Sequence, residues 1–390
     1  MKPLDVEINP PKSSPVDLLI ISGEHSGDEI AAKCVAGLFK SKKDINIVCI
    51  GGPKLRNEGA DLIFNLVDHS VVGFVDVIRN YKFFKTIFNA TIEWIEKYKP
   101  RHICFVDFPG FNLRLAEQLY LKKLSKKGGG NIGLHYYVSP QIWSWKSKRR
   151  FKMDCYLNSL ACLFPFEKKY YEDTSLDVSY VGHPFADDDY NPPVKYDKNG
   201  PLLILPGSRI NAVKRLAPII FNAFFELYND FKKLEGLVIY PSNKIKILLE
   251  DILKDFPDIK DRVKLTKNDG VVSARAAIMS SGTMSLNMAL ASVPGVVIYA
   301  LSPINYYLIQ LLGKIKFIGL ANLILEKEIY TELLQGKAKP KKIAQAVKPY
   351  LFDYQSLHSF TEASQLIKDK LTNERDLSVD KWLRSKLKIL

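Results

Sequence analysis

Residues 17–28 read DLLIISGEHSGD, a short apolar run followed by a glycine-containing turn. The apolar run is typical of a buried strand. Gly23 and Gly27 permit a tight turn, and Ser26 is placed to cap the amphipathic helix that the following residues predict. The free backbone N–H groups at such a helix start can bind an anion or a sugar hydroxyl, although a plain strand-to-helix turn explains the same letters.

The alternation of strands and helices continues along the chain. Further apolar runs that predict strands begin at Ile45, His102, Gly133, Leu202, Gly236, Ala276 and Gly295. Such alternation indicates parallel, doubly wound sheets. We therefore expect an α/β protein with two Rossmann-like domains whose parallel sheets face a central cleft, and ligands bound beyond the carboxyl ends of the strands.

The length of 390 residues is too great for one compact core and suits two domains. Residues 184–200 are polar and proline-rich, so we expect them to link the domains. This places an N-terminal domain at 1–183 and a C-terminal domain at 201–354. We expect the final helices, within 355–390, to pack back on the N-terminal domain.

The chain carries 56 basic and 42 acidic side chains, a formal net charge of +14. A surplus of this size favours an anionic partner, but charge alone does not choose among nucleic acid, acidic phospholipid and phosphorylated substrates. The five cysteines form no CxxC pair, which favours buried reduced thiols and a reducing compartment. We find neither a signal peptide nor an apolar stretch of bilayer-spanning length, so we expect a soluble or peripheral protein.

The motif VDFPGFN, residues 106–112, ends an apolar strand at Asp107. A carboxylate at a strand end can project into a cleft and accept the proton of an attacking hydroxyl. The alternative is that Asp107 caps the next turn.

Two glycine–serine turns follow predicted strands in the second half: LPGSR, residues 205–209, and SSGT, residues 280–283. Glycine allows a phosphate to approach the backbone closely, and the serine hydroxyl can donate a hydrogen bond to it. Arg209 can donate hydrogen bonds to two phosphate oxygens at once. The pair favours a nucleotide diphosphate site over two ordinary turns. The acidic run from Asp187 to Asp189 resembles a DxD metal motif, but its place in the proline-rich stretch favours a solvated charge run, and we expect no metal site.

Residues 71–88 and 304–320 are apolar and basic together. Each fits either a helix that packs on the core with its basic face in solvent, or a surface that binds anionic lipid. The membrane patch expected on the second interpretation comprises Phe74, Arg79, Lys82, Phe83, Phe84 and Lys85.

From about residue 17 to 350, the order of motifs resembles the lipid-A-disaccharide synthase family. The motifs are GEHSGD, GGPKLRNEGA, VVGFVDVI, DFPGFN, HYYVSPQIWSWKSKR, FPFEKKYY, YVGHP, LPGSR, SSGTMSLN, LANLIL and TELLQ. The string YVSPQIWSWKSKR, residues 137–149, is the most specific of them. The resemblance implies a GT-B fold and an inverting transfer from UDP-2,3-diacylglucosamine to 2,3-diacylglucosamine 1-phosphate, giving a β-1,6 disaccharide 1-phosphate and UDP.

The resemblance also implies that the enzyme needs no metal or cofactor and works in the cytoplasm, at the inner face of the cytoplasmic membrane. Its partners would then be the two sugar lipids and anionic membrane lipid rather than nucleic acid. An oligomer is possible. Acyl chain length, ester or amide linkage and the order of substrate binding stay open.

Site residues carry over by position. Asp107 would be the catalytic base, with Glu24, Ser26 and Asn112 on the acceptor side. The donor side would comprise Gly207, Ser208, Arg209, Ser281, Gly282, Thr283, Asn287, Asn322, Glu332 and Gln335.

The chain departs from the family pattern at His25, Ala212, Asn287 and Ala321. The departure at Asn287 concerns donor binding, because a glutamate at this position commonly holds ribose hydroxyls in GT-B enzymes. Two other functions are also compatible with the sequence. One is another GT-B enzyme acting on UDP-sugars, such as a UDP-N-acetylglucosamine 2-epimerase or the peptidoglycan glucosaminyltransferase. The other is an inactive, membrane-bound UDP-sugar-binding protein.

Overall fold

A computed structural model of the chain divides it into two compact units. The first comprises Met1–Pro184 and Glu374–Leu390, and the second Phe185–Asn373. The structure describes residues 7–42, 44–69, 81–144, 146–187, 190–267, 270–280, 282–299 and 317–388.

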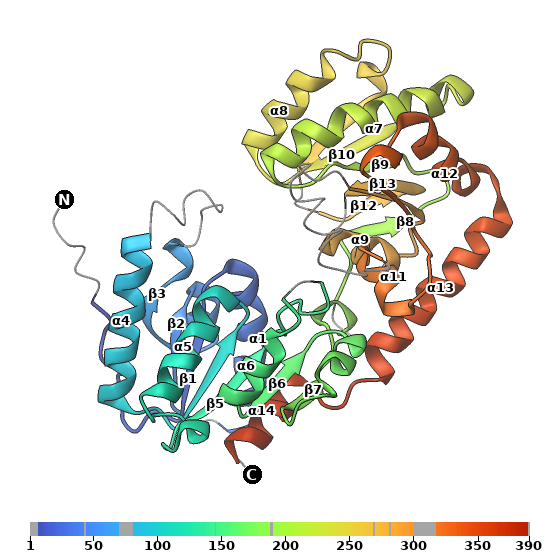
Figure 1. Cartoon of the computed structure of the whole chain (residues 1–390). Helices are drawn as coiled ribbons and strands as arrows, with labels where there is room; N and C mark the ends of the chain where they lie inside the picture. The colour runs from blue at the N-terminus through green and yellow to red at the C-terminus, as the bar shows by residue number, and fades with distance from the viewer. Residues whose placement is uncertain are drawn as a thin grey trace. The chain divides into compact units, whose positions relative to one another are not determined.

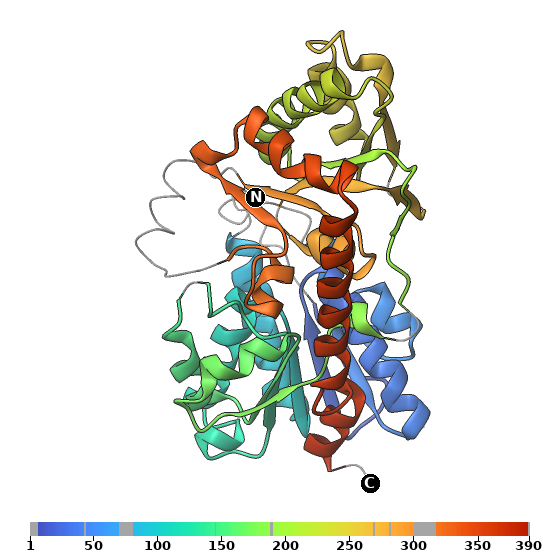
Figure 2. The ribbon, with the colours of Figure 1, turned by 90° about the vertical axis from the view of Figure 1, so that its right-hand side faces the viewer.

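The first unit is built on a seven-stranded parallel sheet in the order β3-β2-β1-β4-β5-β6-β7. Its strands are β1 (Leu18–Ser22), β2 (Ile47–Gly51), β3 (Asp61–Asn65), β4 (His102–Val106), β5 (Gly133–Tyr137), β6 (Ser159–Cys162) and β7 (Asp177–Tyr180). Its helices include α1 (His25–Ser41), α2 (Pro53–Asn57), α4 (Tyr81–Tyr98), α5 (Pro109–Leu121), α6 (Arg149–Tyr156) and α14 (Val379–Leu387). Helices α1 and α5 cover opposite faces of this sheet (Figure 1, Figure 2). The strand order reverses between β1 and β4, which is where a doubly wound sheet binds ligands.

The second unit repeats this plan with a six-stranded parallel sheet in the order β11-β10-β9-β13-β14-β15. Its strands are β9 (Leu202–Leu205), β10 (Gly236–Tyr240), β11 (Val263–Lys267), β13 (Ala276–Ser280), β14 (Gly295–Tyr299) and β15 (Thr331–Leu334). Its helices include α7 (Ile210–Asp230), α8 (Asn243–Leu253), α9 (Thr283–Leu290), α11 (Leu320–Leu325), α12 (Pro340–Phe352) and α13 (Tyr354–Asn373). Here the order reverses between β9 and β13. The expectation of two Rossmann-like domains with parallel sheets is confirmed.

The boundaries between the units differ from those expected at two places. The stretch 184–200 contains a strand, β8 (Val194–Tyr196), which pairs with β12 (Val272–Ala274) of the second unit. Helix α13 also belongs to the second unit, because Phe360 packs its ring against Tyr330 at 5.0 Å. The segment Glu374–Leu390, which includes α14, returns to the first unit, where the buried Trp382 ring contacts His135 and Tyr137 of β5.

All five cysteines are free, and four of them are buried while Cys155 is exposed. Among the described residues, no helix is long and apolar enough to cross a membrane.

Candidate functional site

The turn after β4 holds Asp107 in an unusual backbone conformation. Asp107 and Phe108 both lie in the left-handed region, with φ of 49° and 50°. Each such residue costs roughly 1–3 kcal/mol unless surrounding contacts compensate. Three hydrogen bonds do so. The Asn112 Nδ2 and the Tyr136 hydroxyl donate to the Asp107 carbonyl oxygen at 2.8 and 2.6 Å, and the Asp107 N–H donates to the Tyr137 carbonyl at 3.0 Å. The Asp107 side chain is thereby fixed at the carboxyl end of β4.

The environment of Asp107 suits a base that works near neutral pH. Burial, helped by the negative charge of Glu24, raises the pKa of Asp107 to about 6, and a backbone hydrogen bond from Phe108 opposes this rise. Within the described part of the chain, no lysine, arginine or histidine pairs with this carboxylate. A partly buried carboxylate with such a pKa can accept a proton from a hydroxyl.

Asn112 supports this turn from inside the unit. It is fully buried, and its Nδ2 also lies 3.4 Å from the carbonyl oxygens of Ile21 and Val106. It therefore ties the ends of β1 and β4 together and positions Asp107. Its expected place on the acceptor side stays a prediction.

The GEHSGD turn lies against the Asp107 turn. A Cβ at Gly23 would collide with the Phe108 ring, so only glycine lets the two turns meet. Glu24, His25 and Ser26 are exposed beside them. The expectation that Ser26 caps the next helix is wrong: Glu24 occupies the N-cap of α1, and no side chain caps it.

Asp28 has a role that the sequence analysis missed. Its buried carboxylate accepts hydrogen bonds from the backbone N–H groups of Gly52 and Lys54 at 2.8 and 2.9 Å, and so caps α2 from α1. A Cβ at Gly52 would collide with this carboxylate. The GGP letters at residues 51–53 were the signal, since they mark a backbone that another group approaches closely.

The LPGSR and SSGT turns of the second unit lie side by side, because β9 and β13 are neighbours. Gly207 has a φ of 109°, and a Cβ there would lie 3.2 Å from the Ser280 Oγ. Ser208 and Arg209 are exposed, with Arg209 at the N-cap of α7. The second turn leads through Gly282, whose φ is 139°, to the exposed Thr283 at the start of α9. Ser281 lies outside the described residues.

Asn322 of α11 and Glu332 of β15 hold each other and the backbone around them by hydrogen bonds. The fully buried Asn322 donates to the Tyr330 carbonyl and to Glu332 at 2.8 Å each, and accepts from the backbone N–H groups of Ile329 and Tyr330 at 2.9 and 3.0 Å. The Glu332 carboxylate accepts from the N–H groups of Ile318 and Gly319, both at 2.8 Å. Burial raises the pKa of Glu332, and these hydrogen bonds oppose the rise.

The Asn322 side chain thus makes its hydrogen bonds inside the protein, and its expected place on the donor side stays a prediction. Gln335 lies directly after β15, is partly buried and has a φ of 50°.

The side chain of Asn287 on α9 also makes a hydrogen bond inside the protein. It is 5% exposed, and its Oδ1 accepts a 2.6 Å hydrogen bond from the Tyr190 hydroxyl. Sequence reasoning missed Tyr190, because 97 residues separate the two.

Only part of the expected membrane patch can be placed, since Phe74 and Arg79 lie outside the described residues. Lys82 and Lys85 are exposed on the first turns of α4. Phe83 and Phe84 are half-buried and join an aromatic row. The Phe83 ring lies 4.7 Å from His69, and the Phe84 ring lies 6.3 Å from Phe108. This row leads from α4 to the Asp107 turn.

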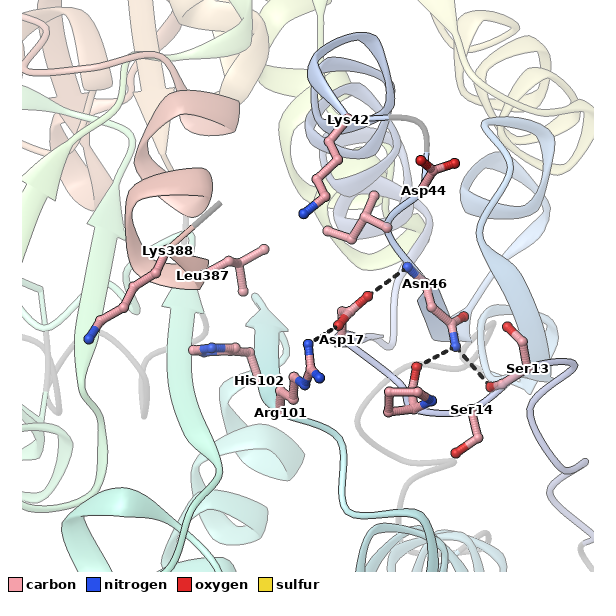
Figure 3. Close-up of a pocket in the computed structure, with 12 residues that line it drawn as sticks. Ser13, Ser14, Asp17, Lys42, Asp44, Asn46, Arg101, His102, Leu387 and Lys388 are labelled. Atoms are coloured by element: carbon pink, nitrogen blue, oxygen red, sulfur yellow. Dashed lines mark hydrogen bonds and ion pairs between the residues drawn. The ribbon is translucent and has the colours of Figure 1, made fainter. Parts of the chain in front are cut away.

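A hollow of about 570 Å³ lies in the first unit, at the ends of β1 and β4 opposite to the Asp107 turn (Figure 3). Its wall includes Asp17, which precedes β1, and Arg101, which precedes β4. These two form a 2.9 Å ion pair, and the Asn46 N–H donates to the other Asp17 oxygen at 3.0 Å. Lys42, Asp44 and Lys388 also line the hollow, which lies far from the Asp107 turn along the strands.

Comparisons with known proteins decide the family. The model of the lipid-A-disaccharide synthetase family matches residues 18–386. The lipid-A-disaccharide synthase of Coxiella burnetii is 32% identical over 342 residues, which cover 85% of this chain and 87% of that protein. Lipid-A-disaccharide synthase 1 of Legionella pneumophila is 32% identical over 370 residues, 92% and 94% of the two chains.

The chain belongs to the lipid-A-disaccharide synthase family. It is therefore a glycosyltransferase of lipid A biosynthesis, and the resemblance stated from its motifs is confirmed.

Solved structures with little sequence similarity show the same fold. A UDP co-structure of MnaA from S. aureus has a TM-score of 0.60 at 13% identity and covers 96% of this chain and 98% of that one. The calicheamicin glycosyltransferase CalG4 has a TM-score of 0.52 at 11% identity, over 97% and 100% of the two chains. The synthase-family chain accordingly has the GT-B fold, with one Rossmann-like unit in each half.

Proposed function

We propose that the chain transfers the sugar of UDP-2,3-diacylglucosamine to 2,3-diacylglucosamine 1-phosphate, with inversion at the anomeric carbon. The products are the β-1,6-linked disaccharide 1-phosphate and UDP. The observation that carries the proposal is the Asp107 carboxylate, held at the switch point of the first sheet with a pKa of about 6 and no cationic partner among the described residues.

In the proposed reaction, the O6 hydroxyl of the acceptor attacks the anomeric carbon of the donor. Asp107 takes the hydroxyl proton as the new C–O bond forms, and the bond from the anomeric carbon to the diphosphate breaks. UDP leaves with the electron pair of that bond. Arg209 and the N–H groups at the start of α9 would stabilise the charge that develops on the diphosphate.

We propose that this charge stabilisation needs no metal. Among the residues that the structure describes, no group of three or more His, Cys, Asp or Glu side chains could hold a metal ion. Asp187 is described, whereas Asp188 and Asp189 lie outside the described residues. The test is UDP release in excess EDTA, which we expect to continue at the same rate. Loss of activity that Mg²⁺ or Mn²⁺ restores would contradict the proposal.

We further propose that the enzyme works as a peripheral protein on the inner face of the cytoplasmic membrane. The net charge of +14 and the exposed Lys82 and Lys85 favour an anionic surface. The aromatic row from Phe83 to the Asp107 turn would give acyl chains an apolar path.

The test of the reaction is the structure of its product. The enzyme is incubated with both sugar lipids, and the product is analysed by mass spectrometry and proton NMR. We expect a disaccharide 1-phosphate whose new anomeric proton shows the large coupling of a β linkage. An α linkage would contradict inversion. Hydrolysis of the donor without transfer, or epimerisation of its sugar, would contradict the synthase function.

A further inference from the structure

The hydrogen bond between Tyr190 and Asn287 places a residue of the polar stretch 184–200 on α9. The Tyr190 hydroxyl donates to the Asn287 Oδ1 at 2.6 Å. The Tyr190 ring stacks on Phe185, with ring centroids 4.5 Å apart and ring planes 14° apart. The hydrogen bond and the ring contact together hold the phenol over α9.

The position of Asn287 connects this contact to the donor nucleotide. Asn287 follows Thr283 by four residues, so the two lie on the same face of α9, about 6 Å apart along the helix axis. Thr283 begins the helix at the phosphate turn. A step of about 6 Å from a diphosphate matches the place of the ribose in a nucleoside diphosphate.

A phenol hydroxyl and a ribose hydroxyl are both neutral donors, and each can fill the same amide oxygen. Because Asn287 is 5% exposed, leaving its Oδ1 without a donor would carry a desolvation cost. Tyr190 removes this cost while no nucleotide is bound.

We infer that Tyr190 is an internal substitute for a ribose hydroxyl: it occupies the Asn287 oxygen in the free protein, and the nucleotide displaces it. The inference rests on the proposed UDP-sugar site at the ends of β9 and β13. Tyr190 then sets donor affinity, since every nucleotide that binds must first release this hydrogen bond.

Calorimetry with UDP tests the inference in the Tyr190→Phe variant. The phenyl ring can still stack on Phe185, but without the hydroxyl it no longer competes with the ribose for the Asn287 Oδ1. UDP should therefore bind roughly two- to tenfold more tightly, the range expected for one neutral hydrogen bond. Without nucleotide, this variant should melt at a lower temperature than the wild type, and saturating UDP should raise its melting temperature more.

Two controls tie the gain to the ribose and to Asn287. Of 2′-deoxy-UDP and 3′-deoxy-UDP, the analogue that lacks the hydroxyl bound by Asn287 should show no gain in Tyr190→Phe. In a protein that already carries Asn287→Ala, adding Tyr190→Phe should leave UDP affinity unchanged, because the shared oxygen is gone. Should Tyr190→Phe fold poorly, Tyr190→Leu removes the same hydroxyl and serves the same comparison.

The outcomes separate this inference from the proposed function. Wild-type protein that binds no UDP would overturn the donor site and the inference together. Wild-type protein that binds UDP, with unchanged or weaker binding in Tyr190→Phe, would leave the donor site standing and overturn the role of Tyr190. A gain that is equal for UDP and both deoxy analogues would also overturn it.

Discussion

The Asn112 side-chain amide donates a 2.8 Å hydrogen bond to the main-chain carbonyl oxygen of Asp107. This contact lets two consecutive non-glycine residues, Asp107 and Phe108, keep left-handed conformations. The side chain of Asp107 is oriented through its own backbone, so its carboxylate remains available for chemistry. We therefore predict that Asn112 affects the reaction through the position of Asp107.

We expect Asn112→Ala to lower both stability and turnover. The Asp107 carbonyl keeps the Tyr136 hydroxyl but loses its second donor, which costs about 1–3 kcal/mol for a buried group. Thermal melting and steady-state kinetics measure the two effects, and kcat should fall with KM nearly unchanged. Asn112→Asp should be worse in both assays, because a carboxylate oxygen would face three carbonyl oxygens. An Asn112→Asp protein as stable as Asn112→Ala would contradict the assigned contacts.

The raised pKa of Asp107 predicts the acid limb of the pH–rate profile. The base must be unprotonated, so kcat/KM should fall about tenfold per pH unit below a midpoint of about 6. Glu24→Gln removes a negative charge that raises this pKa, and the midpoint should move to lower pH by a fraction of a unit. Glu29→Gln, on the same helix, is the control that should leave the midpoint in place. A midpoint that stays near the ordinary aspartate value of about 4 in the wild type would count against Asp107 as the base.

The apolar runs predicted the strands that frame the site, because a buried parallel strand can be recognised from a short local stretch of sequence. They placed Asp107 at a strand end and the turns at Gly207 and Gly282 in one domain, and the structure shows both. The left-handed conformation at Asp107 could not be predicted from the sequence, because Asn112 and Tyr136 stabilise it through tertiary contacts.

The same limit explains the other differences. Asp28 caps α2 across 24 residues, and Tyr190 reaches Asn287 across 97. Glu24 took the N-cap position that the sequence suggested for Ser26, because the strand-to-helix turn ends earlier than its glycines indicate. The last helices were assigned together from position alone, whereas Phe360 and Trp382 pack on different units.

Arg209→Ala should weaken UDP binding about 10- to 150-fold, since a hydrogen bond to a charged group contributes about 1.5–3 kcal/mol. Calorimetry with UDP measures the change. The melting temperature should hardly move, because Arg209 is exposed at the start of α7. Arg215→Ala removes an exposed arginine from the same helix and should bind UDP normally. Equal affinity in Arg209→Ala and Arg215→Ala would show that the Arg209 guanidinium contacts no phosphate.

Reversal of two charges on α4 tests membrane binding. Lys82→Glu/Lys85→Glu should sediment less with anionic vesicles, and the wild-type protein should bind them less as salt rises, because exposed charges are screened over about 10 Å at 0.1 M. Lys341→Glu/Lys342→Glu makes the same charge change at exposed positions of the second unit and is the control. Serine at Phe83 and Phe84 is a poorer test, since both rings also pack inside the first unit. Equal binding of both double variants would place the membrane contact elsewhere.

The most direct test of the central claim is a single-turnover measurement of sugar transfer by Asp107→Asn with both lipid substrates. Asparagine keeps the shape of the side chain and tolerates the left-handed backbone, but it cannot accept the proton. We predict that the transfer rate falls by about 10²–10⁴-fold, the usual contribution of a general base, while UDP affinity and melting temperature stay at wild-type values. A transfer rate within about threefold of the wild type, well below that contribution, would contradict the assignment of Asp107 as the base.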